Sequence, residues 1–280
     1  SIYGGREDCS HEWSKATLYT DTPIREEGGG GLSSEGTAEE LRRERQRSVE
    51  HCPDCGAFRG QLGHEVTVER FVEHLVEIFD SARRVLSEDG SLWVNIGDSY
   101  DADQSLVAGK VPNGPESLKD APDPKSLIGL PERFMIAMLE AGWICRERII
   151  WEKSNPAPDG RAEQDRARTS HEHIFRFVKQ PAYADTGNGP ETTVLTTQTA
   201  EGVNGPIAPM PAAIPQRLLE STTMPDSEAV VCDPFAGSGT VLKAAAERGN
   251  RYLGFDISAE AVSIARDRLA QYEADPETLT

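Results

Sequence analysis

The stretch that decides the fold is Cys232-Asp233-Pro234-Phe235-Ala236-Gly237-Ser238-Gly239-Thr240. It lies between an apolar run at 229–232, which predicts a strand, and residues 240–248, which predict a helix. Gly237 and Gly239 remove side chains where the backbone must bend sharply and approach a ligand. A glycine turn between a strand and a helix is the context in which such a loop binds a nucleotide-like cofactor.

An acidic residue follows the turn at a position in the sequence where dinucleotide-binding folds place their ribose-binding acid. Asp256 comes directly after the next predicted strand, 251–255, where a carboxylate suits a ribose diol. The turn has neither the G-x-G-x-x-G pattern nor a Walker lysine, and Asp233 would repel a phosphate. It suits a ligand with a cationic end, such as the aminoacyl part of S-adenosylmethionine. We therefore expect this cofactor at Asp233, Phe235, Ala236, Gly237, Gly239, Thr240 and Asp256; the alternative is a plain tight turn.

Working outward, helices and strands alternate along the rest of the chain. Helical spacing of apolar residues begins at Thr67, and further predicted elements are helices at 131–141, 215–221 and 259–272 and strands at 91–96, 143–151 and 173–178. This order predicts an α/β domain over 66–280, with a mostly parallel, doubly wound, Rossmann-like sheet. Residues 1–65 contain a glycine run at 28–31 and a charge block at 39–47, which predict a loop-rich insertion with a mobile middle.

The composition gives no support for a membrane-spanning or secreted protein, and it leaves binding of nucleic acid open. The 280 residues carry a net charge of −18, which is unfavourable for binding nucleic acid unless the basic residues cluster. Of the 29 basic residues, 22 are Arg, a balance typical either of a salt-adapted organism or of an acidic protein from a GC-rich one. No apolar run approaches the roughly 18 residues of a membrane span. Five cysteines without a secretory signal predict reduced thiols in the cytoplasm.

Several motifs together resemble one enzyme family. Asp233 to Thr240 is similar to the cofactor motif of DNA amino-methyltransferases, which make N4-methylcytosine and N6-methyladenine. Residues 91–100 resemble their LWLNLGDSY segment, 151–156 their WHKPNP segment and 169–175 their THEYIF segment. Residues 211–221 resemble the helix that precedes the cofactor loop. The order is that of the permuted class, in which the catalytic motif precedes the cofactor motif.

The resemblance implies a methyltransferase fold, S-adenosylmethionine as cofactor and double-stranded DNA as substrate, with a restriction endonuclease as a candidate functional partner. The methyl acceptor would be the exocyclic amine of a flipped base, cytosine N4 ahead of adenine N6. Asn95 and Asp98 are expected beside the active site, and 181–209 as a target-recognition or linker loop. The polar loop after 151 predicts DNA contacts, although a solvated surface is the alternative; its candidates are Lys153, Asn155, Arg166 and Arg168.

One family motif is missing from the sequence. Family members carry a (Ser/Asp/Asn)-Pro-Pro-(Tyr/Phe) tetrapeptide that grips the flipped base, and no Pro-Pro pair occurs in this chain. The resemblance therefore implies that the motif lies upstream of Ser1, and we assign no catalytic residue. We expect the chain as given not to methylate DNA and an upstream-extended form to do so. The alternatives are a remnant that binds cofactor or DNA without methylating, and a nucleotide-dependent oxidoreductase, which should show a phosphate-binding glycine pattern.

Two close pairs of potential metal ligands lie in the N-terminal insertion. Cys9 and His11 form a Cys-x-His pair, and Cys52 and Cys55 a Cys-x-x-Cys pair. Thiolate and imidazole ligands in two such pairs predict a tetrahedral structural zinc site, in which His51 could compete as a ligand. Free surface thiols and redox-active cysteines are the alternatives. The other two cysteines, 145 and 232, are predicted to be core strand residues.

Overall fold

The computed structural model describes residues 2–3, 8–19, 46–55, 57–63, 65, 67–100, 126–156, 166–199 and 210–272. They belong to two compact units, one of residues 1–85 and 97–142 and the other of residues 86–96 and 143–280. Two sequence predictions lie outside the described residues: the glycine run at 28–31 and the end of the 181–209 loop. No helix among the described residues is long and apolar enough to cross a membrane.

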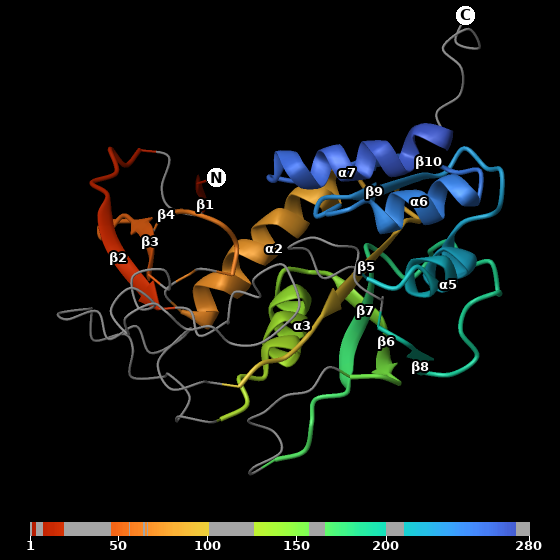
Figure 1. Ribbon diagram of the computed structural model, residues 1–280, viewed down its shortest axis with the longest axis horizontal. Coiled ribbons are helices and arrows are strands. Elements are labelled where there is room, and N and C mark those ends of the chain that lie inside the picture. The colour runs from red at the N-terminus through yellow and green to blue at the C-terminus, as the bar shows by residue number, and fades with distance from the viewer. Residues whose placement is uncertain are drawn as a thin grey trace, which may run out of the picture. The chain divides into compact units, whose positions relative to one another are not determined.

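The larger sheet of the second unit has the order β5-β7-β6-β8 (Figure 1). Its strands are β5 (Ser91–Ile96), β6 (Ile144–Lys153), β7 (His171–Val178) and β8 (Val194–Thr197). β7 runs antiparallel to both β5 and β6, and β8 runs parallel to β6. Because β7 is antiparallel, its first residues lie beside the carboxyl ends of β5 and β6. His173 pairs with Ile96 on one side and with Ile150 on the other.

The cofactor-motif part of this unit is a parallel strand pair with three helices. β9 (Val230–Asp233) pairs in parallel with β10 (Arg251–Gly254), and α6 (Thr240–Glu247) connects them. α5 (Ala213–Thr222) precedes β9, and α7 (Ala259–Leu269) with the short helix η2 (Ala270–Tyr272) follows β10. Figure 1 shows α6 and α7 beside the two strands.

Helix α5 joins the two parts of the unit through its two apolar faces. Ile214 and Leu218 pack in a core cluster with Ile149, Trp151 and Ile174 of the larger sheet. Leu219, one position further along the helix, packs on Ala244 and Ala245 of α6. Adjacent residues of a helix point about 100° apart, so one helix serves both cores. Packing thus explains why this helix lies just before the cofactor loop, as the resemblance to the family implies: it connects the larger sheet with α6.

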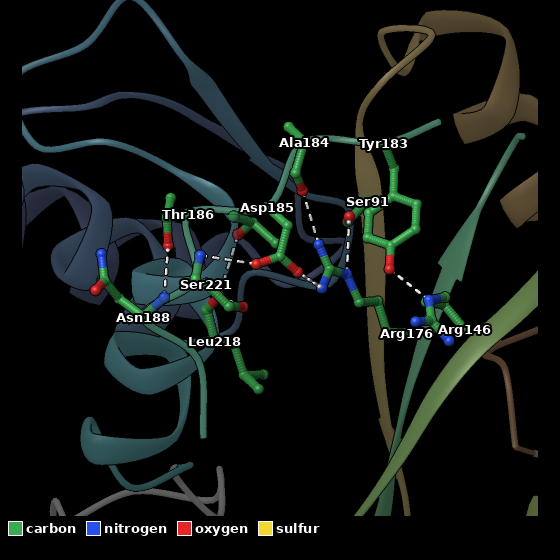
Figure 2. Close-up of polar contacts among 12 residues, drawn as sticks. Ser91, Arg146, Arg176, Tyr183, Ala184, Asp185, Thr186, Asn188, Leu218 and Ser221 are labelled. Carbon is green, nitrogen blue, oxygen red and sulfur yellow. Dashed lines mark hydrogen bonds and ion pairs between the residues drawn. The ribbon is translucent and has the colours of Figure 1, made fainter. Parts of the chain in front are cut away.

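A buried arginine fixes the end of β7 to the segment that leads toward α5 (Figure 2). The Arg176 side chain is 3% exposed, and it donates to Asp185 Oδ2 at 2.7 Å, to the Ala184 carbonyl at 2.8 Å and to Ser91 Oγ at 3.1 Å. Its guanidinium also lies 4.7 Å from the ring centre of Tyr183. A buried guanidinium is tolerated only when its donors have partners, and here three acceptors supply them.

The first unit combines a small sheet with two packed helices. An antiparallel sheet of order β1-β4-β3-β2 is formed by β1 (Ile2–Tyr3), β2 (Ser14–Tyr19), β3 (Gln46–His51) and β4 (Phe58–Arg59). α2 (Val68–Val85) is capped by Thr67, whose Oγ accepts from the Arg70 amide at 3.2 Å. It packs on α3 (Leu130–Glu140) through an edge-to-face contact of Phe79 with Phe134.

The structure confirms the predicted α/β composition and the helices and strands of the 66–280 region to within a few residues. One expectation was wrong. The sheet is not mostly parallel among the described strands, because β7 turns back between β5 and β6. Within the predicted insertion, β3 begins at Gln46, inside the charge block, and pairs with β2. Polar strands escape an apolar-periodicity search when their stability comes from pairing. β8, within 181–209, was also missed, because four residues are too few to show a period.

Candidate cofactor site

The predicted cofactor residues form one compact loop between β9 and α6. Asp233 is the last residue of β9, and its Oδ1 accepts a hydrogen bond from the Phe235 amide at 2.9 Å. The Ala236 amide donates to the Phe255 carbonyl at 2.9 Å, and the Phe255 amide donates to the Asp233 carbonyl at 2.9 Å. The loop is therefore attached by its backbone to the end of β10, as the parallel pairing of the two strands requires.

Asp256, just after β10, holds the loop with one carboxylate oxygen and the start of α7 with the other. Oδ2 accepts from the Gly237 amide at 2.8 Å, and Oδ1 accepts from the Ser258 amide at 2.8 Å. Each carboxylate oxygen has two lone pairs, so each can accept one further hydrogen bond from a hydroxyl. The carboxylate is thus positioned to bind a diol while it fixes the turn that faces the same ligand.

Two carboxylates lie close together in this loop. Burial raises the pKa of Asp233 above its ordinary value of 3.8; the amide of Phe235 opposes this rise, and the negative charge of Asp256 adds to it. A cationic group next to Asp233 would relieve both unfavourable effects, because an opposite charge stabilises the ionised carboxylate. This electrostatic situation favours a ligand with an ammonium group and disfavours one with a phosphate.

Gly239 is required at the start of α6. It caps the helix at φ 79°, in the left-handed region, and a Cβ there would lie 3.0 Å from the Cβ of Ala265 and 3.2 Å from its Cα. Arg268 of α7 reinforces the same contact, since its Nη1 donates to the Ser238 carbonyl at 2.8 Å. The glycine thus permits both the turn and the close approach of α7.

We expect Gly239→Ala to lower the free energy of unfolding by about 2–5 kcal/mol, because left-handed strain costs about 1–2 kcal/mol and overpacking costs about 1–3 kcal/mol. Gly187→Ala is the matched control: Gly187 has φ 75°, and a Cβ there meets nothing within 4 Å. It should lose only the strain part. Urea titration of both variants measures the difference, and equal losses would show that the contact with Ala265 costs nothing.

Three family-like segments meet in a second polar cluster at the end of the larger sheet. Glu172, at the start of β7, accepts from Asn95 Nδ2 at 2.6 Å and from Lys153 Nζ at 2.5 Å. Asn95 and Lys153 lie near the carboxyl ends of β5 and β6, where ligands gather in open α/β sheets. Glu172, which lies in the segment that resembles THEYIF, thus joins the predicted active-site neighbour Asn95 to the predicted DNA contact Lys153.

The other predicted residues have the following surroundings. Asp98 accepts from the amides of Gly129 and Leu130 at 3.2 and 3.0 Å, so it caps α3 across 31 and 32 positions of sequence. Asn155 Oδ1 accepts from the Thr199 amide at 2.6 Å. Arg168 is exposed and Arg166 partly so. The active-site role of Asp98 and the DNA contacts stay predictions. The predicted metal ligands, Cys9, His11, Cys52 and Cys55, do come together.

The sequence is similar to a family and to curated relatives. A family model described as DNA methylase, of the N6/N4 methyltransferase type, matches residues 19–267. Type II methyltransferase M.Cfr9I of Citrobacter freundii is 35% identical over an alignment of 231 residues, and the match covers 75% of this chain and 74% of the relative. Type II methyltransferase M.XycI of Xanthomonas campestris pv. cyanopsidis is 33% identical, with the same shares of both chains.

Solved structures share the fold at lower identity. The PvuII DNA methyltransferase, named as cytosine-N4-specific, has a TM-score of 0.53 at 19% identity and covers 75% of this chain and 74% of its own. A putative DNA modification methylase from Thermus thermophilus, complexed with S-adenosyl-L-methionine, has a TM-score of 0.54 at 22% identity. That match covers 76% of this chain and 82% of the other. At these identities the likeness concerns the fold.

Proposed function

This chain belongs to the DNA methylase family and is a DNA amino-methyltransferase, and from that premise we propose the reaction and the residues that serve it. The methyl group of S-adenosylmethionine is transferred to the exocyclic amine of a base in double-stranded DNA. The C–S bond of the sulfonium breaks, the N–CH₃ bond forms, the amine loses a proton, and S-adenosylhomocysteine is released. The observation that carries the proposal is the Asp233–Thr240 loop with Asp256 bound to the Gly237 amide.

The loop residues act by positioning the cofactor. Asp256 binds the ribose hydroxyls, and Asp233 attracts the ammonium of the aminoacyl end, whose positive charge offsets the burial and the Asp256 charge that raise the pKa of Asp233. Phe235 is 46% exposed and offers its ring as an apolar surface beside the loop. Fixing the methyl carbon in line with the amine supplies much of the rate in such a transfer, because the reacting atoms are held in near-attack geometry.

The Asn95–Glu172–Lys153 cluster forms a wall of the site on the larger sheet. Glu172 is fixed by its two partners, so its carboxylate and the amide of Asn95 have defined positions. Asn95 Oδ1 is buried and accepts no hydrogen bond among the described residues, so this wall contains an acceptor without a donor. Arg166 and Arg168 supply phosphate contacts from the loop that precedes β7, and Lys153 and Asn155 border the same loop.

The acceptor base is cytosine in this proposal, with adenine as the alternative that the experiment distinguishes. The enzyme works in the cytoplasm on double-stranded DNA. A restriction endonuclease of the same specificity is its functional partner, as the Type II names of the relatives suggest.

A methyl-transfer assay tests the reaction. Tritiated S-adenosylmethionine is incubated with mixed-sequence DNA and with the 280-residue chain or a longer form that carries the sequence encoded upstream. Label in DNA is the expected result for the longer form and not for the 280-residue chain, and nucleoside analysis should find it in N4-methylcytosine. Label in N6-methyladenine would overturn the choice of base. No transfer by either form, with cofactor binding intact, would contradict the reaction and favour the non-catalytic alternative.

A further inference from the structure

We propose that Cys9, His11, Cys52 and Cys55 bind one structural zinc ion in the first unit. Their ligand atoms, one per residue, all lie within 4.8 Å of one another. They come from two places that are far apart in sequence, just before β2 and just after β3. The hypothesis from the Cys-x-His and Cys-x-x-Cys spacing thus gains a spatial basis that the sequence could not provide.

Two distances within the cluster are close to those of a tetrahedral thiolate–imidazole site. With Zn–S bonds near 2.3 Å and Zn–N bonds near 2.0 Å, the edges of the tetrahedron are about 3.8 Å between two sulfurs and about 3.5 Å between sulfur and nitrogen. The Sγ atoms of Cys9 and Cys52 are 3.7 Å apart. Cys55 Sγ is 3.3 Å from Nδ1 of His11. A disulfide would need about 2.0 Å, so the sulfurs are spaced as metal ligands rather than as a bonded pair.

The ligand set itself selects the metal. Three thiolates and one imidazole in a closed tetrahedral site are typical of structural zinc. His51 does not belong to the group whose ligand atoms converge, so the competition with His11 is decided by geometry. None of the four ligands is fully exposed: Cys52 is completely buried and the other three are partly buried. Partial burial would make the uncoordinated polar atoms unfavourable, and coordination removes that penalty.

Residues around the cluster hold the ligands in place. His11 has φ 50°, a left-handed conformation that a non-glycine residue adopts only when its surroundings enforce it. Its ring lies against that of Trp13, with 5.1 Å between centroids. Arg59 covers Trp13 at 4.1 Å and pairs with Glu50 at 3.1 Å. Such outer contacts orient a ligating imidazole, as they do in known metal sites.

The zinc would stabilise a small sheet that has two very short strands. β1 and β4 have two residues each, and isolated strands of this length are unstable in water. The ion would link the two ends of the segment between His11 and Cys52, which contains the β2–β3 pair. The turn that holds Cys52 and Cys55 is itself closed by a hydrogen bond from the Cys52 amide to the Ala57 carbonyl at 2.8 Å. Phe58 of β4 stacks on His74 of α2, so the sheet is anchored to the unit's helices.

The first experiment is elemental analysis of the full chain, purified without chelator and without a metal-affinity tag. We expect about one zinc per chain in the wild type and in Cys145→Ser, a matched control because Cys145 lies in β6 outside the cluster. Cys55→Ser and Cys52→Ser should lose most of the zinc. Binding of S-adenosylhomocysteine by the second unit, measured by calorimetry, shows whether these variants are folded elsewhere.

A second measurement does not depend on the variants. Replacement of the metal in the wild type by cobalt should give the d–d absorption of tetrahedral cobalt together with thiolate charge-transfer bands. A folded wild type without metal, a Cys9–Cys52 disulfide in the fresh protein, iron in place of zinc, or an octahedral cobalt spectrum would each overturn the proposal.

Discussion

Arg176→Ala should be among the most destabilising single substitutions in the second unit. The guanidinium is 3% exposed and bonds three acceptors, so its removal leaves Ser91 Oγ and the Ala184 carbonyl without their donor and opens a cavity between Trp93 and Tyr183. Loss of one member of a buried ion pair costs about 3–5 kcal/mol. Because Asp185 is 42% exposed and regains solvent, we expect about 2–4 kcal/mol, or a fall in Tm of roughly 5–15 °C.

Arg217→Ala is the control for this substitution. Arg217 also pairs with a carboxylate, Glu220 at 2.6 Å, but its side chain is 44% exposed and the pair lies on the surface of α5. An exposed pair contributes between about 0 and 1 kcal/mol. Thermal unfolding followed by circular dichroism compares the two variants. Equal shifts in Tm would mean that the buried network of Figure 2 contributes no more than a surface pair.

The pH dependence of the same difference identifies Asp185 as the partner. Partial burial is the largest single influence and would raise the pKa of Asp185. The hydrogen bonds from Arg176 and the Gly187 amide, together with the charges of Arg176 and Arg146, outweigh it and hold the pKa below 3.8. A carboxyl whose pKa is lower in the folded protein contributes stability above its unfolded pKa and loses it as the pH falls through the folded value. The gap in stability between wild type and Arg176→Ala should therefore be constant well above pH 3.8 and shrink below it.

The sequence predicted what depends on local pattern. The apolar spacing of Val68 to Val85 defined α2, and the glycines at 237 and 239 defined the cofactor turn. Both signals, helical periodicity and turn-forming glycines, depend only on neighbouring residues in the sequence. The convergence of the two metal-ligand pairs was predictable for a different reason. Close pairs of cysteine and histidine are typical of metal sites, and a metal site requires the two pairs to meet in space. Their spacing therefore predicts a contact between residues that are distant in the sequence.

What escaped the sequence depends on contacts between distant residues. Asp98 was expected beside the active site, but its capping of α3 joins positions more than 30 residues apart. Glu172 had no assigned role until the antiparallel β7 brought it between Asn95 and Lys153. The strands β2 and β8 are short and only half apolar, so their apolar pattern does not identify them and they depend on their pairing partners. Local propensity cannot specify such pairings, because a strand's stability resides in its neighbours.

Asp256→Ala should weaken the binding of S-adenosylhomocysteine roughly 100-fold, which corresponds to about 2.7 kcal/mol. One or two hydrogen bonds to a charged group, at about 1.5–3 kcal/mol each, account for a loss of this size. Asp267→Ala, an exposed acid on α7, changes the net charge equally and should leave the affinity unchanged. Isothermal titration calorimetry measures all three proteins, and equal affinities for wild type and Asp256→Ala would remove Asp256 from the site.

A ligand without ribose hydroxyls separates the two roles of this carboxylate. Asp256 both faces the proposed ribose position and fixes the loop through the Gly237 and Ser258 amides, so the alanine variant alone cannot distinguish them. If the carboxylate binds the diol, a 2′,3′-dideoxy analogue of S-adenosylhomocysteine should bind wild type and Asp256→Ala with similar affinity, because the interaction is already missing. If it only fixes the loop, the substitution should weaken both ligands by the same factor. The coupling energy from this four-way comparison assigns the contact, and a value near zero would leave Asp256 as a residue that positions the loop and does not touch the cofactor.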